Sequence, residues 1–222
     1  MPKSYSIIIK KKKYFLLENK KEITINNKKI VFDSKDEALN FEKRILEINS
    51  ELPHEIIALF YFSSKLQKEN RMNIVSLILE KLTFDNLLYL SPIDKEINVT
   101  IRKNQKKYVS IFEKKFDLKF TLLESSIDYQ INLFTNKFKI YLENLSNEGL
   151  TVFYKFTQLN SSPILTYLFY EERINLDTLY KISNFEDIYN EKKWGKTDEK
   201  MIINKNLKKT FKNLLNFFRL IT

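Results

Sequence analysis

The chain of 222 residues has no cysteine, one histidine and two glycines, and each scarcity excludes a class of chemistry. Without cysteine there is no disulfide, no thiolate metal site and no cysteine nucleophile. Because His54 is the only histidine, paired-histidine zinc motifs are impossible. Gly149 and Gly195 cannot build a phosphate-binding loop or a dinucleotide fingerprint, which need several glycines within a few residues. We therefore expect no cofactor, no bound metal and no catalytic residues.

The sequence predicts neither a membrane-spanning segment nor a leader segment. Only three consecutive apolar residues precede Lys10, which is too few for a secretory signal. No apolar run approaches the roughly 20 residues that span a bilayer. The sequence therefore predicts a protein without stable membrane insertion, located in a bacterial cytoplasm, or in the mitochondrial matrix if it is a mature eukaryotic form.

Lysine and aromatic residues are abundant. Lys and Arg number 38 against 28 Asp and Glu, a net charge of +10, but the lysines are spread along the whole chain. A solvated lysine surface explains this spread, and nucleic-acid binding is the alternative. Aromatic residues make up 14% of the chain and recur at helical spacing, so they belong to the core first. Any surplus suits an apolar docking face for another protein, which we favour over a pocket.

The hydrophobic pattern predicts an α+β fold: a small antiparallel β-sheet with a covering helix at the N-terminus, followed by a mainly α-helical C-terminal domain. Short strands are expected at residues 4–9, 14–18, 22–25 and 29–32, with a turn at Asn26 and Asn27. A helix capped by Asp33 or Ser34 is expected to run to about residue 48. The expected later helices are 54–67, 70–82, 99–116, 130–145, 150–159, 163–172, 176–190 and 206–220, and residues 84–90 are ambiguous between a strand and a helical turn. The predicted domains are 1–52, with an extension to about 92 as the alternative, and 53–222.

One local motif goes beyond composition. Trp194, the only tryptophan, directly precedes Gly195 at the end of an amphipathic segment. Gly195 is expected to end the helix in a left-handed conformation, with Trp194 either packed back or docked outward. His54 is interpreted as a capping or surface residue. The carboxylate pairs Asp94/Glu96, Glu171/Glu172 and Asp198/Glu199 could serve a hydrolase, but in a lysine-rich chain they are more often solvated.

Taken in order, several motifs resemble the F1-ATP synthase assembly chaperones that hold the F1 α subunit, a family of mitochondria and their bacterial relatives. The matching segments are residues 29–45 with Ala38, the Asp-x-Leu-x-Tyr pattern at 85–89, Gln105 with Tyr108, residues 161–170, residues 190–195 with Trp194 and Gly195, and the acidic Asp198 and Glu199. The sequence departs from the family at Thr24-Ile25, at Arg44-Ile45, at Tyr108 in place of Trp, and at Asn190 in place of Gln.

The resemblance implies a non-enzymatic protein that binds the F1 α subunit before that subunit pairs with β, and we expect a monomer. It implies partner-binding residues Trp194, Gly195, Asp198, Glu199, Tyr89, Tyr108 and Gln105. Trp194 would be an anchor, with a buried structural tryptophan as the alternative, and Asp198 and Glu199 would make polar contacts at the rim. For Tyr89 and Tyr108 packing in the core is the favoured role. The alternative function, from a different class, is binding of single-stranded nucleic acid by a basic protein.

Overall fold

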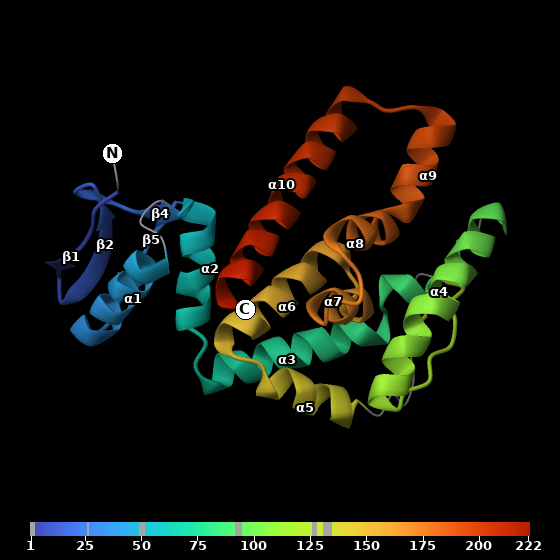
Figure 1. Ribbon diagram of the computed structural model, residues 1–222, viewed down its shortest axis with the longest axis horizontal. Coiled ribbons are helices and arrows are strands. Elements are labelled where there is room, and N and C mark those ends of the chain that lie inside the picture. The colour runs from blue at the N-terminus through green and yellow to red at the C-terminus, as the bar shows by residue number, and fades with distance from the viewer. Residues whose placement is uncertain (1–2, 26, 49–51, 92–94, 126–127, 131–134) are drawn as a thin grey trace.

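A computed structural model describes residues 3–25, 27–48, 52–91, 95–125, 128–130 and 135–222 (Figure 1). The chain begins with an antiparallel sheet of short strands. These are β1 (Tyr5–Lys10), β2 (Lys13–Glu18), β3 (Lys21–Glu22) and β6 (Val31–Phe32), beside a separate hairpin of β4 (Thr24–Ile25) and β5 (Lys28–Lys29). Strand β2 pairs with β1 along its whole length and also with β3 and β6.

The strand connections are tight and use positive backbone φ angles. Lys11 and Lys12, with φ of 50° and 62°, form the two-residue loop between β1 and β2. Asn27, with φ of 62°, lies in the β4–β5 turn where the sequence predicts one, while Asn26 lies outside the described residues. The single strand expected over 22–25 is wrong. The buried Ile23 separates β3 from β4, and its N–H still bonds Leu16 O at 3.1 Å.

Helix α1 (Lys35–Ile48) covers one face of this sheet, as expected. The Ser34 hydroxyl oxygen accepts the N–H of Glu37 at 3.2 Å and so caps the helix. Ala38, Phe41 and Ile45 recur at spacings of three and four and are buried. The Phe41 ring centroid lies 5.1 Å from that of Phe32 on β6. The sheet and helix α1 therefore pack against each other as two layers.

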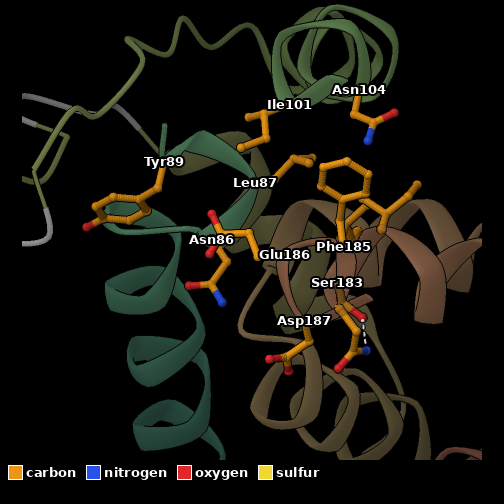
Figure 2. A pocket seen from close by; sticks show the side chains of 12 residues that line it. Asn86, Leu87, Tyr89, Ile101, Asn104, Ser183, Phe185, Glu186 and Asp187 are labelled. Carbon is orange, nitrogen blue, oxygen red and sulfur yellow. Dashed lines mark hydrogen bonds between the residues drawn. The ribbon is translucent and has the colours of Figure 1, made fainter. Parts of the chain in front are cut away.

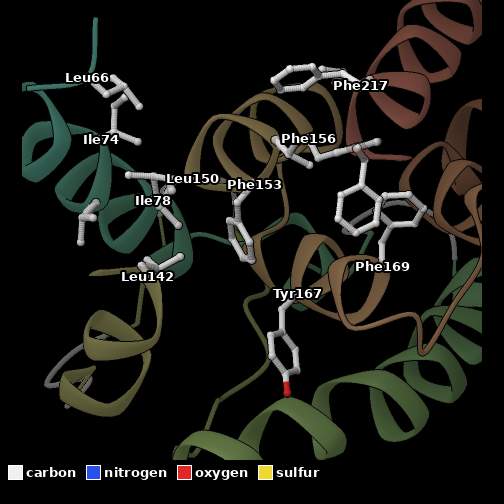
Figure 3. Packing of buried hydrophobic residues seen from close by; sticks show 14 of the residues in the cluster. Leu66, Ile74, Ile78, Leu142, Leu150, Phe153, Phe156, Tyr167, Phe169 and Phe217 are labelled. Carbon is white, nitrogen blue, oxygen red and sulfur yellow. The ribbon is translucent and has the colours of Figure 1, made fainter. Parts of the chain in front are cut away.

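The rest of the described chain is mainly helical, which confirms the predicted α+β class. Its elements are α2 (His54–Ser64), α3 (Lys68–Thr83), η1 (Asn86–Leu88), α4 (Lys95–Phe116), α5 (Asn136–Asn144), α6 (Asn147–Asn160), α7 (Pro163–Tyr170), α8 (Leu176–Ser183), α9 (Phe185–Trp194) and α10 (Asp198–Ile221). Helices α6 and α7 lie at the centre, and Figure 3 shows their aromatic side chains pointing in several directions. Tyr167 packs on Phe112 and Phe116 of α4, and Phe156 faces Phe211 of α10.

Helix α2 connects the sheet to the helical body. Its Tyr61 hydroxyl donates to Val31 O at 2.7 Å and accepts the Val31 N–H at 3.3 Å, so one side chain extends the hydrogen bonding of β6. On the other side of α2, the Phe60 ring lies 4.6 Å from Phe217 of α10. Buried residues form one continuous cluster across this join. The domain boundary at residue 52 stays a prediction.

Most expected helix limits lie within four residues of those in the structure, but three expected helices differ more. Of the helix expected over 130–145, the described residues form α5, while the buried Gln130 side chain bonds the backbone N–H and C=O of Thr121 instead. The helix expected over 176–190 is two helices, separated where the Asn184 side chain bonds Tyr180 O and competes with the backbone. The last helix begins at Asp198, eight residues before the expected start, behind a Thr197 cap. Residues 84–90 contain a helical turn, η1, followed by a single bridge from Tyr89 to Leu123.

A fully buried carboxyl group fixes η1 against the α6–α7 corner. Asp85 Oδ1 accepts the Leu87 N–H at 2.8 Å, and Oδ2 accepts the Ile164 N–H at 3.0 Å. Burial raises the pKa of Asp85 to about 6, although the hydrogen bonds from Ser162, Ile164 and Leu87 act in the opposite direction. The first residue of the Asp-x-Leu-x-Tyr motif is therefore structural: it holds the turn that leads to Tyr89.

Candidate functional site

Two helices near the C-terminus lead away from the packed body and carry the Trp194 motif. We call α9, the connection 195–197 and residues 198–210 of α10 the arm (Figure 1). All residues of α9 are described and none is buried, and the first buried residue of α10 is Phe211. Phe211 anchors α10 by packing on Tyr180 and Phe156. The arm thus contributes little to the core, so stability alone does not explain its apolar residues.

Polar contacts join the two helices of the arm. Lys200 Nζ lies 2.7 Å from Asp187 Oδ1, and the Asn204 amide donates to Glu191 Oε1 at 2.5 Å. Because both pairs are spaced by four residues, they lie one turn apart along a single seam. Lys196 Nζ lies 3.1 Å from Glu191, and this contact, with the Asn204 bond, lowers the pKa of Glu191. The Lys200–Asp187 pair is partly exposed and contributes only about 0–1 kcal/mol, whereas the Glu191 side chain, 10% exposed, is the most buried part of the seam.

Four apolar side chains near the connection between α9 and α10 face solvent. Trp194 is 78% exposed and Ile202 is 63% exposed, and Met201 and Ile203 are about half exposed. These four residues, which we call the apolar tip, lie within ten positions of one another, on either side of the helix-to-helix connection. The reading of Trp194 as a buried structural residue is wrong, and an outward-facing tryptophan remains.

Gly195 ends α9 in a conformation that only glycine adopts readily. Its φ of +84° lies in the left-handed region that the sequence predicts for it, and its ψ of 179° is extended. A Cβ at this position would meet no atom within 4 Å. Glycine is therefore required by the backbone angles and not by lack of space. This extended step lets α10 start in a new direction.

The acidic residues after Gly195 begin α10. The Thr197 hydroxyl oxygen accepts the Lys200 N–H at 3.3 Å, and Asp198 and Glu199 occupy the first turn, where carboxylates stabilise the helix dipole. Both carboxylates are exposed. They lie beside the apolar tip, so they are placed to make polar contacts at its rim.

At its base, α9 packs against the start of α4. Phe185 and Tyr189 are partly buried against a small cluster of Leu90, Ile97 and Ile101. A cavity of about 330 Å³ opens beside them, between η1, α4 and the α8–α9 corner (Figure 2). Figure 2 shows the Phe185 ring pointing toward α4 within this cavity. The base of the arm is therefore fixed by apolar contacts, in contrast to its polar seam.

The structure gathers some predicted site residues and separates others. Trp194, Gly195, Asp198 and Glu199 lie together at the end of the arm. Tyr89 lines the cavity at the base, where its hydroxyl donates to Asp128 O at 2.7 Å. Tyr108 is buried in the core, the role that the sequence favours for it. Gln105 lies in α4, and its side chain is outside what the structure describes.

Sequence reasoning missed Met201, Ile202 and Ile203, because it began the last helix at Asn206. The signal was present in Thr197, Asp198 and Glu199, a capping residue followed by two acidic residues, which is typical of a helix start. The exposure of these apolar residues could not be predicted, since it depends on the direction in which the arm leaves the packed body.

Other candidate chemistry finds little support in the described part of the chain. His54 begins α2 as an exposed residue, with Nε2 3.1 Å from Glu18 Oε2. Among the described residues no group of three or more His, Cys, Asp or Glu side chains gathers as a metal site would. Of the carboxylates considered for a hydrolase, Asp94 lies outside the described residues, and Glu171 accepts the Tyr141 hydroxyl at 2.8 Å. Within the described residues, no helix is long and apolar enough to cross a membrane.

Comparison with known proteins finds the same fold in solved structures of bacterial proteins. No protein-family model and no curated protein matches the sequence. Among solved structures, the fold is that of the Atu1473 protein of Agrobacterium tumefaciens, which is named as a candidate chaperone. The TM-score is 0.71 and the sequence identity is 14%, over 98% of this chain and 84% of that one. The fold is also that of Atp12 from Paracoccus denitrificans, with a TM-score of 0.71 and 13% identity over 99% of this chain and 96% of that one. A point mutant of the same Atp12 agrees equally well, with a TM-score of 0.70. The resemblance to the assembly chaperones is therefore confirmed for the fold over the whole chain.

Proposed function

We propose that this protein is an assembly chaperone that binds the unassembled F1 α subunit of ATP synthase through the arm. The observation that carries the proposal is the apolar tip, exposed on a chain with the Atp12 fold. A chaperone for an unpaired subunit needs apolar surface to cover the interface that the true partner later occupies. Such a chaperone needs no cofactor and no catalytic group, so the proposed function is not enzymatic.

The arm is suited to this task by its construction. Trp194 and Ile202 are free to bury their whole exposed surface against a partner, and burial of each such side chain contributes about 1.5–3 kcal/mol. Asp198 and Glu199 would form the polar rim that surrounds the centre of an interface. Because α9 and α10 are joined by a few polar contacts along this seam, the helices can adjust to the bound surface without disturbing the core.

The mechanism is mass action. Binding of the lone subunit lowers its free concentration and covers a surface that would otherwise aggregate. Release follows when the β subunit binds the same surface more tightly. The compartment is then that in which the α subunit is made or folded, the cytoplasm in a bacterium, and the chaperone acts as a monomer.

The test is capture of the F1 α subunit from the same genome, measured as a dissociation constant for the wild type and matched variants. Ile202→Ser should weaken binding by 10-fold or more, and Trp194→Ala by at least as much, because both remove buried apolar surface. Ile140→Ser is the matched control, since Ile140 is 57% exposed and lies on α5, away from the arm in Figure 1. Equal affinities for the Ile202 and Ile140 variants would contradict a role for the arm.

A further inference from the structure

Helix α4 carries a concentrated positive charge. It has seven cations and two carboxylates, a net charge of +5 in 22 residues of a chain whose total is +10. All seven cations are exposed, and we call the six that follow Lys95 the basic face: Arg102, Lys103, Lys106, Lys107, Lys114 and Lys115. At 100° per residue most of them project to the side opposite the buried Ile101, Phe112 and Phe116.

The basic face lacks carboxylate partners. None of its six cations forms an ion pair with a residue that the structure describes, although Lys107 lies over the Tyr108 ring, whereas exposed lysines elsewhere do form ion pairs, such as Lys10 with Glu22 and Lys137 with Asp117. Arg102 and Lys106 are spaced by four residues, as are Lys103 and Lys107, so like charges face each other. Each such pair costs a few tenths of a kcal/mol. The helix thus bears a repulsion that an acidic partner would relieve.

The basic face adjoins the arm. Helix α4 begins where α9 packs, with the Tyr189 hydroxyl 3.5 Å from Glu96 and Phe185 against Ile101. From there the cations run from Arg102 to Lys115 over about 20 Å of helix. A partner seated on the arm would meet α4 on the side of α9 away from α10, as Figure 1 shows.

We propose that the basic face binds a carboxylate-rich patch on the same protein partner that the apolar tip captures, and that it speeds their association. This inference rests on the proposed function and adds the chemistry of the partner surface. Exposed Val99 and Ile111 lie among the cations, a mixture that suits a protein surface. Single-stranded nucleic acid would need an exposed ring for stacking, but the one aromatic among these cations, Tyr108, is buried. A bilayer would need the apolar side of α4, which faces the core.

The test is the association rate with the purified F1 α subunit across a salt series. The face variant is Lys103→Glu, Lys107→Glu and Lys114→Glu. The control is Lys21→Glu, Lys28→Glu and Lys35→Glu, three exposed lysines near the sheet for which no ion pair is found within the described chain. Since each substitution changes the charge by two, both variants fall from +10 to +4. At 0.05 M salt the face variant should associate 10-fold to 100-fold more slowly than the wild type, with a dissociation rate within about threefold. The control should stay within about threefold, and the difference should shrink at 0.5 M salt.

Each other outcome contradicts a different part of the argument. Equal slowing of both variants, with capture intact in the wild type, would show that net charge acts and would overturn the inference while the proposed function stands. Absence of capture by the wild type would contradict the proposed function itself. The remaining outcome concerns other anionic ligands, probed at 0.15 M salt with a 20-nucleotide thymidine strand and with vesicles that contain 25% phosphatidylserine. If the face variant captures the α subunit unchanged but loses binding to one of these probes, the basic face belongs to that ligand and the inference is overturned.

Discussion

Replacement of the buried Asp85 should change how stability depends on pH. In the folded protein burial raises the pKa of Asp85 to about 6, from an ordinary 3.8. The folded state therefore holds the proton more tightly than the unfolded state. A carboxyl group of this kind gives its full stabilisation below pH 3.8 and loses it as pH rises through 6. A difference of about two pH units corresponds to about 3 kcal/mol, of which about 2 kcal/mol falls between pH 4.5 and 8.

Asp85→Asn removes this titration while keeping the shape of the side chain. The amide has only one acceptor oxygen, so either the Leu87 N–H or the Ile164 N–H loses its partner, at a cost of about 1–3 kcal/mol at every pH. The variant should therefore be less stable than the wild type at pH 4.5. Toward pH 8 it should gain about 2 kcal/mol relative to the wild type, and reach or pass it.

The assay is urea unfolding of both proteins at half-unit steps from pH 4.5 to 8. The difference between the two free energies of unfolding cancels the other titrating groups, so its slope reports Asp85 alone. Asp128→Asn is a suitable control, because Asp128 is exposed and its carboxylate oxygen accepts only the Ser125 N–H of its own turn. A difference that stays constant across the range would refute the reasoning about the buried carboxyl.

Three further changes test the backbone and the join between the sheet and the helices. Lys12→Gly should raise the free energy of unfolding by about 1 kcal/mol in a thermal melt, because Lys12 has a φ of 62° that glycine adopts without strain; an unchanged or lower value would contradict the assigned turn. Tyr61→Phe should lower it by about 1–3 kcal/mol, because the N–H and C=O of Val31 lose their partner, and no change in urea unfolding would show that water replaces the hydroxyl. Gly195→Ala should strain the arm by about 1–3 kcal/mol, seen as faster hydrogen exchange in α9 while the core stays protected; equal exchange in α9 would refute the strain.

The general fold followed from the sequence because its patterns are local. Ser34 and Ser162 are caps recognisable from the residues that follow them, and Ala38, Phe41 and Ile45 repeat at helical spacing and are buried. Where tertiary contacts decide, the prediction was wrong. Gln130 looks like the start of a helix, but its side chain bonds Thr121, nine residues away in the sequence. No local pattern contains that information.

The candidate site was predicted in part. The Trp194–Gly195 motif and the acidic residues after it were found, because a unique tryptophan beside a rare glycine stands out in this composition. Ile202 was not predicted, because its exposure depends on the direction of the arm. The sequence of α10 is amphipathic whether the helix packs on the core or projects from it. The sequence shows Asp85 only as the first residue of the Asp-x-Leu-x-Tyr motif. Its burial results from the packing of the α6–α7 corner and cannot be predicted locally.

The central claim is that this chain protects an unassembled F1 α subunit. The most direct measurement is the amount of soluble α subunit when it is expressed with and without this protein, followed by addition of purified β subunit to the recovered complex. The account predicts more soluble α subunit, a complex that copurifies, and release of this protein when β is added. No gain in soluble α subunit and no complex would contradict the claim.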